Sequence, residues 1–109
     1  FVYFDFSRPS DIPAPLLHTF DVVVVDPPFI TQDVWAKYAE TCRLLLREDG
    51  QGKLLVSSIV ENEALLQTLL HPSLQRCAFQ PSIPHLVYQY NFYANFQPIV
   101  LAHLNPELE

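Results

Sequence analysis

Four consecutive valines, Val22–Val25, constrain the fold of this chain more than any other feature of its sequence. An unbroken β-branched run, preceded by Asp21 and followed by two prolines, predicts a central strand buried on both faces, as parallel sheets require. The strand then ends at Asp26. Ligands of open α/β sheets bind outside the carboxyl ends of the strands, so this carboxylate is predicted to lie in a functional site.

The residues that follow the strand are expected to be rigid. Proline fixes its own φ and restricts the residue before it, so Asp26 and Pro27 are expected in extended conformations, with backbone carbonyls that have few helical partners. Phe29 comes directly after Pro28 and can form a flat wall over whatever those acceptors hold.

Residues 26–29 resemble the Asp/Asn-Pro-Pro-aromatic motif of S-adenosylmethionine-dependent amino-group methyltransferases. The whole chain is similar to the N6-adenine methyltransferase-like family, whose members include lysine methyltransferases of translation elongation factor 1A. The similarity covers about residues 1–97, and the segments that follow the family's order and spacing are residues 1–6, 20–29, 52–56, 77–81 and 93–96. The chain departs from the family in two respects: residues 88–90 read Tyr-Gln-Tyr instead of Asn-Glu-Phe, and the two strands expected before Phe1 are absent.

The resemblance implies catalytic roles for Asp26, Pro27, Pro28 and Phe29. The Asp26 carboxylate and the Pro27 carbonyl would accept the two N–H groups of an amine, whose lone pair then faces the methyl donor. The carboxylate would also stabilise the positive charge that develops on nitrogen. A lysine substrate must first lose a proton to Asp26 or to a water beside it. The alternative is a strand that ends in a purely structural Asp-Pro turn.

Further site residues are implied by the same resemblance. Asp5 and Phe6, with Asp26, would bind the cofactor S-adenosylmethionine, although Asp5 could instead cap a turn. The substrate side would comprise Phe29, Phe79, Pro81 and His85, and His85 could equally be an ordinary surface histidine. Both glycines of the chain follow a predicted helix instead of opening one, which is the wrong context for a cofactor-binding loop.

The order of predicted elements is β-β-α-β-α-β-β, which resembles the carboxyl-terminal half of a Rossmann-like class I methyltransferase sheet. The resemblance implies that the last strand is antiparallel to the others. Apolar spacing predicts helices from an N-cap at Thr31 to Leu46 and over residues 61–70. Strands are expected at residues 1–6, 22–25, 53–58, 74–79 and 86–96. In the last strand, alternation places Tyr93 and Asn95 on the polar, exposed side. The chain is thus expected to be one partial α/β domain, 1–109, in which residues 98–109 form an extension, either an edge strand or a docked segment.

Charge favours a protein substrate over nucleic acid. The net charge is −6, and the six Lys and Arg residues are scattered, so this chain offers no basic stripe for phosphates. Methylation of a protein lysine, with elongation factor 1A as the favoured partner, is therefore the main hypothesis. N6-adenine methylation of RNA or DNA remains an alternative, as does a truncated, inactive subunit that binds a partner through residues 86–96.

Cysteine usage and hydropathy indicate the cellular setting. Cys42 and Cys77 are predicted to be reduced core thiols, and His18, His71 and His103 are too widely spread to form a metal site with neighbouring residues. No apolar run is long enough to cross a bilayer and no secretory signal is visible, which favours the cytoplasm, with the nucleus as the alternative. The chain also lacks methionine, and we expect it to be part of a longer protein.

Overall fold

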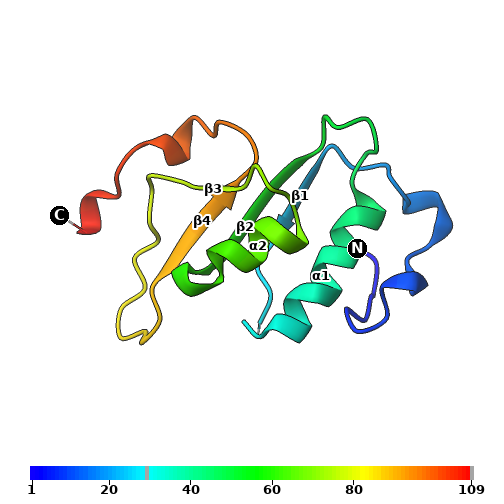
Figure 1. Cartoon of the computed structure of the whole chain (residues 1–109), viewed down its shortest axis with the longest axis horizontal. Helices are drawn as coiled ribbons and strands as arrows, with labels where there is room; N and C mark the ends of the chain where they lie inside the picture. The colour runs from blue at the N-terminus through cyan, green and yellow to red at the C-terminus, as the bar shows by residue number, and fades with distance from the viewer. Residues whose placement is uncertain (29, 109) are drawn as a thin grey trace.

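A computed structural model describes residues 1–28 and 30–108. These residues form an α/β fold whose sheet has the strand order β1-β2-β4-β3 (Figure 1). The elements in chain order are β1 (Val22–Val25), α1 (Gln32–Leu45), β2 (Lys53–Ile59), α2 (Glu63–Leu69), β3 (Gln75–Arg76) and β4 (Tyr90–Ala94).

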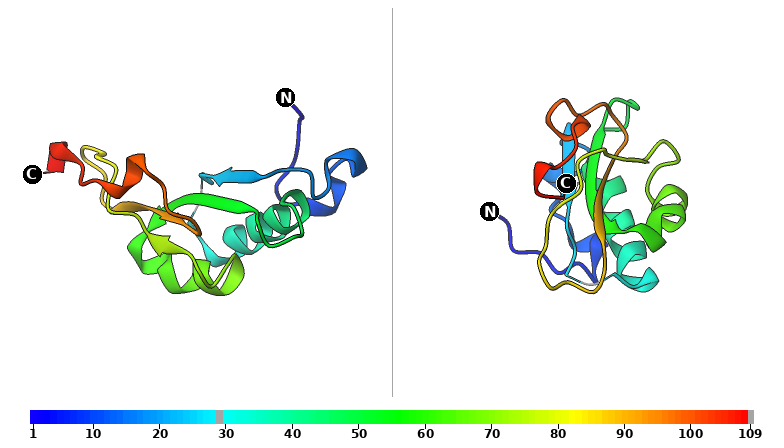
Figure 2. Two further views of the ribbon diagram at one scale, coloured as in Figure 1. Left: turned by 90° about the horizontal axis from the view of Figure 1, so that it is seen from above. Right: turned by 90° about the vertical axis from the view of Figure 1, so that its left-hand side faces the viewer.

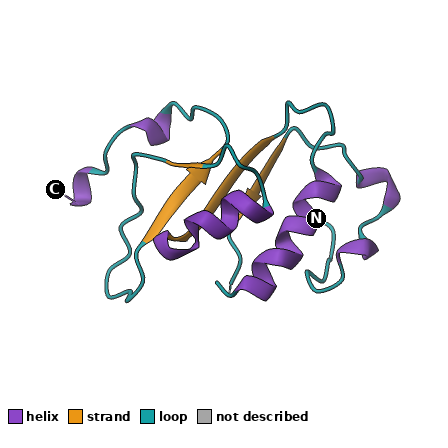
Figure 3. Cartoon of the chain, viewed as in Figure 1, coloured by secondary structure: helices purple, strands orange, loops and turns teal. Residues whose placement is uncertain are grey.

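The sheet is mixed, as the sequence predicted. β1 pairs directly with β2 in parallel, with Val25 opposite Val56, and α1 connects the two strands along the chain. β4 lies between β2 and β3 and is antiparallel to both, which confirms the antiparallel direction of the last strand (Figure 3).

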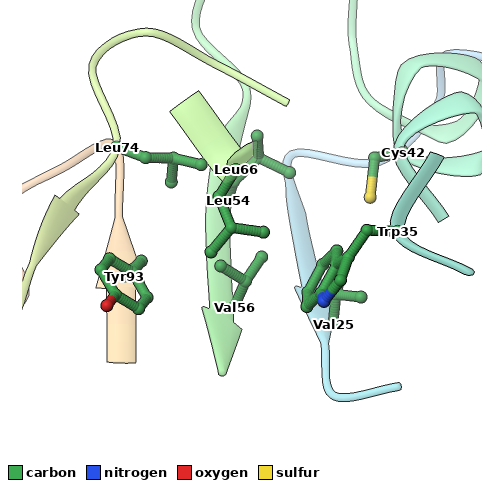
Figure 4. Packing of buried hydrophobic residues seen from close by; sticks show 8 residues of the cluster. All are labelled: Val25, Trp35, Cys42, Leu54, Val56, Leu66, Leu74 and Tyr93. Atoms are coloured by element: carbon green, nitrogen blue, oxygen red, sulfur yellow. The ribbon is translucent and has the colours of Figure 1, made fainter. Parts of the chain in front are cut away.

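Both α-helices cover the same face of the sheet (Figure 2). The core forms where they meet the strands, and Figure 4 shows its members, which are Val25, Trp35, Cys42, Leu54, Val56, Leu66, Leu74 and Tyr93. Trp35 and Cys42 come from α1 and Leu66 from α2, so the predicted apolar faces of both helices are confirmed. Each large side chain buried in this way stabilises the fold by about 1.5–3 kcal/mol.

The prediction that β1 is buried on both faces is wrong. Val25 is buried and Val23 is half-buried, whereas the side chains of Val22 and Val24 are 48% and 68% exposed. Successive residues of a strand face opposite sides, and among the described elements the α-helices lie on one side only. One face of β1 is therefore covered by the helices and the other is exposed, although every residue of the strand is apolar.

The strand predicted at residues 1–6 is also wrong. This segment has no strand assignment and leads into a turn at Phe6 and Ser7. A strand requires a neighbour for its backbone hydrogen bonds, and no strand in the described part of the chain pairs with it. Phe6 packs instead on α1, where its ring stacks on Tyr38 with centroids 5.1 Å apart.

The last two strands are shorter than predicted. β3 has only two residues, and β4 begins at Tyr90, the partner of Ile59 at the end of β2. β2 turns into the 3₁₀ helix Val60–Asn62 at this point, so residues 86–89 have no β2 residue to pair with. The loop before β4 also contains His85 in a left-handed conformation, with φ 64°.

The predicted exposure of Tyr93 and Asn95 is wrong. Tyr93 faces the helices and is completely buried. The amide of Asn95 donates to the Gly52 carbonyl at 3.1 Å and accepts from the Leu54 amide at 2.7 Å, joining β2 to the end of β4. Alternation was identified correctly, but the helices lie on the Tyr93 side of the strand.

The tail from residue 98 forms two short 3₁₀ turns and not an edge strand. It docks on the segment after β3 by two hydrogen bonds: the Phe79 amide donates to the Leu101 carbonyl, and the Asn105 side chain donates to the Gln80 carbonyl at 2.7 Å. In the described residues, no helix has the length and apolarity needed to cross a bilayer.

The two cysteines differ in their surroundings. Both are free, but only Cys42 is fully buried, and burial raises the pKa of its thiol to about 12. Cys77 is half-buried after β3, so its predicted place in the core is only partly correct.

Candidate active site

The candidate site lies at the carboxyl end of β1. Because β1 and β2 are parallel, their carboxyl ends lie at the same edge of the sheet, and the antiparallel β4 contributes its amino end. The residues that meet at this edge are Asp26 after β1, Ser57 near the end of β2, and Phe92 opposite Ser57 in β4.

Asp26 is exposed and is held by one strong hydrogen bond. The hydroxyl of Ser57 donates to Oδ1 of Asp26 at 2.5 Å, within the range of a charge-assisted O–H···O⁻ bond. A carboxylate has lone pairs on both oxygens. Within the described residues, Oδ2 has no recorded partner, so one oxygen of Asp26 is held by the protein and the other is available to a ligand.

The two prolines of the motif have different environments. Pro27 is buried and Pro28 is exposed, so the loop is anchored directly after Asp26 and reaches the surface one residue later. Phe29 lies outside the described residues, and its catalytic and substrate-binding roles stay predictions.

The loop that carries the motif begins at Asp26 and leads to Ile30, and we call it the motif loop. Asn62 binds its far end. Its side-chain amide donates to the Ile30 carbonyl at 2.9 Å and to the Ser58 hydroxyl at 3.1 Å. Asn62 precedes α2 but makes no capping bond with its side chain. Its hydrogen bonds therefore join the motif loop to the end of β2 and do not stabilise the helix terminus.

Asp5 lies in an exposed turn before the first 3₁₀ helix. Its Oδ1 accepts bonds from the Ser7 hydroxyl at 2.7 Å and from the Ser7 amide at 2.9 Å. The hydroxyl, and then the amide, hold the pKa of the Asp5 carboxyl below its usual range. Both Ser7 donors use Oδ1, and among the described residues Oδ2 has no partner, so the cofactor role of Asp5 stays a prediction. Among the described contacts, none joins Asp5 or Phe6 to Asp26.

Three of the predicted substrate residues, Phe79, Pro81 and His85, lie in the segment between β3 and β4. The Phe79 ring faces that of Phe92, with centroids 6.4 Å apart, and Phe92 is the cross-strand partner of Ser57. Residues of one cross-strand row share a face of the sheet. Asp26 and Phe79 are thus linked across the sheet through Ser57 and Phe92.

The loop between Phe79 and β4 places Pro81 and His85 in different surroundings. Pro81 lines a small cavity of about 160 Å³ with several residues of this loop and Leu108 of the tail, whereas His85 does not line it and is exposed. Within residues 1–28 and 30–108, no group of three His, Cys, Asp or Glu side chains could hold a metal ion.

Sequence reasoning missed Ser57, Asn62 and Phe92. A signal for Ser57 existed, because Ser57 and Ser58 interrupt the otherwise apolar run that forms β2. The parallel pairing then places Ser57 beside Asp26. Asn62 carries no such signal, since an asparagine before a predicted helix is more simply explained as an N-cap.

Comparison with known proteins extends over nearly the whole chain. A family model described as probable N6-adenine methyltransferase matches residues 1–98. The protein-lysine N-methyltransferase M142.8 of Caenorhabditis elegans is 34% identical over 103 residues, which cover 94% of this chain and 45% of the relative.

Two vertebrate relatives have similar coverage. EEF1A lysine methyltransferase 1 of Gallus gallus is 32% identical and that of Homo sapiens 31% identical, each over 98 residues that cover 88% of this chain and 43% of the relative. The chain thus spans less than half the length of these curated relatives. No solved structure has significant similarity to the chain.

Proposed function

Because the chain belongs to the probable N6-adenine methyltransferase family, we propose that it is part of an S-adenosylmethionine-dependent enzyme that methylates a protein lysine. The observation that carries the proposal is the exposed Asp26 carboxylate at the end of a parallel strand, with Oδ1 bound by Ser57 and Oδ2 available. Relatives named as lysine methyltransferases favour lysine as the acceptor, and the acidic chain favours a protein over a nucleic acid.

The cofactor would lie between Asp5, Phe6 and Asp26, and when bound it supplies an electrophilic methyl group on a sulfonium sulfur. The exposed Asp5 carboxylate suits ribose hydroxyls, and both carboxylates have an unused Oδ2 among the described contacts. We propose that Asp5 orients the cofactor and that Asp26 orients the amine.

Asp26 would act on the substrate nitrogen in three ways. Its Oδ2 accepts one N–H while the Pro27 carbonyl accepts another, which directs the lone pair. The carboxylate, or a water bound to it, takes the proton that a lysine ammonium must lose and passes it to solvent before transfer, so that the exposed Asp26 is again negatively charged when the methyl group moves. As the new C–N bond forms and the carbon–sulfur bond breaks, the negative charge stabilises the cationic amine.

Phe29, Phe79, Pro81 and His85 are proposed to surround the lysine side chain. Phe79 is the best supported of these residues, because its ring packs on Phe92 in the same cross-strand row as Ser57. Elongation factor 1A is the proposed protein substrate, since several relatives carry its name, and the cytoplasm is the proposed location.

The proposal is tested by incubating the protein, expressed from its complete coding sequence, with labelled S-adenosylmethionine and one of two acceptors. The acceptors are elongation factor 1A and adenine-containing RNA or DNA. We expect label on a lysine, located by mass spectrometry, and a 100- to 1000-fold lower kcat for Asp26→Ala, about the effect of removing a hydrogen-bonding group from a site of transition-state charge. Label on adenine N6 alone would replace lysine with the nucleic-acid substrate, and full activity of Asp26→Ala would overturn the catalytic assignment.

A further inference from the structure

The end of β2 and the turn after it contact both described ends of the motif loop. Ser57 binds the first residue, Asp26, and Asn62 binds Ile30, which follows the motif. The two anchors come from positions only five residues apart, joined by the last residues of β2 and the 3₁₀ helix Val60–Asn62. One short segment of the chain therefore binds the residues on both sides of the loop.

The anchors are linked to each other through the core. The side-chain amide of Asn62 donates to the Ile30 carbonyl and also to the hydroxyl of Ser58, which is completely buried. Its neighbour Ser57 points to the opposite face, because successive residues of a strand alternate. The two serines thus connect Asp26 on the open face with Asn62 on the helix face.

Resting on the proposed function, we propose that Ser57 and Asn62 are positioning residues that hold Asp26 and its loop in the geometry required for methyl transfer. Neither needs to touch the substrate. The Ser57 hydroxyl binds Oδ1 and so fixes the orientation of the carboxylate, which leaves Oδ2 without a partner among the described residues. Asn62 prevents the loop exit from moving away from β2.

The position of Asp26 matters because methyl transfer is an in-line reaction. A displacement of about 1 Å in a reacting or orienting group can lower the rate by about 100-fold. Asp26 is exposed, and among the described residues only Ser57 is recorded as a partner of its carboxylate. Without the hydroxyl, the carboxylate can rotate toward water and present either oxygen.

The test for Ser57 compares two β-branched replacements of nearly equal shape. Ser57→Thr keeps the hydroxyl and Ser57→Val removes it, while both suit a strand. With the protein expressed from its complete coding sequence, we expect Thr to retain wild-type kcat and Val to lower kcat by about 10- to 100-fold without raising the KM for the substrate. Equal kcat for Thr and Val would overturn the role of the hydroxyl.

The matched test for Asn62 is Asn62→Asp. Aspartate has the same shape and is an equally good residue before a helix, but its carboxylate cannot donate to the Ile30 carbonyl. We expect kcat to fall and the thermal midpoint to change little. The double variant Ser57→Val/Asn62→Asp should lose less than the product of the two single losses, because both anchors fix one loop.

The outcomes separate this proposal from the proposed function. If the wild-type protein methylates no lysine, the proposed function fails and the positioning role fails with it. If the wild-type protein is active but Ser57→Val and Asn62→Asp retain its kcat, the positioning role alone is overturned.

Discussion

Replacing Tyr93 with phenylalanine should stabilise the protein. Tyr93 is completely buried, and its hydroxyl has no hydrogen-bond partner among the described residues (Figure 4). A buried polar group without a partner costs about 1–3 kcal/mol of desolvation. Tyr93→Phe removes that oxygen and keeps the ring that packs in the core, so the free energy of unfolding should rise by a similar amount.

The pH dependence gives an independent test of the same surroundings. Burial, and then the nearby negative charge of Glu63, raises the pKa of Tyr93 to about 12, compared with 10.0 for an ordinary tyrosine. The unfolded chain thus releases this proton at lower pH than the folded chain. Stability from the neutral phenol is complete below pH 10 and is lost as the pH rises toward 12. Tyr93→Phe should reduce the loss of stability in this interval.

Urea denaturation at neutral pH and at several values above pH 10 measures both effects. Tyr3→Phe is the matched control, because Tyr3 is 88% exposed and the same atom is removed without relieving a buried polar group. A Tyr93→Phe variant that is less stable than wild type by more than about 1 kcal/mol would refute the reasoning, since the hydroxyl must then make a net favourable bond.

Three other predictions concern separate parts of the chain. Gly52→Ala should lower the thermal midpoint, because the added Cβ would lie 2.3 Å from Cγ of Leu46 and such overpacking costs about 1–3 kcal/mol. An unchanged midpoint would show that Leu46 moves aside freely. Phe29→Tyr should be tolerated, whereas Phe29→Ala should weaken substrate use more than cofactor binding, measured by KM and by titration calorimetry; equal losses would place Phe29 on the cofactor side. Purified by itself, the 109-residue chain should self-associate through the edge strand β1. Replacing the exposed Val22 and Val24 by lysine should restore a monomer in sedimentation velocity, because charge on an edge strand opposes pairing. An unmodified chain that is already monomeric would contradict this prediction.

The helices and the parallel pair were predictable because their signals are local. Spacing identified the buried face of α1 through Trp35 and Cys42, and the continuous apolar run at residues 53–58 identified β2. The position of Asp26 at the sheet edge follows from the same local signals. Pro27 and Pro28 cannot continue a central strand, so the strand must end just before them, at Asp26.

The errors concern which face of a strand is covered, and this depends on distant parts of the chain. Alternation in β4 defines two faces but does not state which one the helices cover, so Tyr93 was placed outside. The four valines of β1 lack alternation altogether, and full burial was inferred from composition. Residues 1–6 have strand propensity, but propensity does not supply a pairing partner. Ser57 and Asn62 acquire their roles only through the register and the turn after β2.

The core fixes the candidate site through that register. Val25 and Val56 lie opposite each other on the helix face with almost no exposed surface, so Asp26 and Ser57, one residue further along each strand, must share the open face. A shift of β1 by one residue would bring Val22 and Val24 to the helix face in place of Val23 and Val25, so the valines alone do not distinguish the two registers. It would also bring Asp26 toward the helices and away from the Ser57 hydroxyl. The cost of placing the Asp26 carboxylate under the helices therefore favours the observed register, in which the carboxylate meets its hydrogen-bond donor at the open edge.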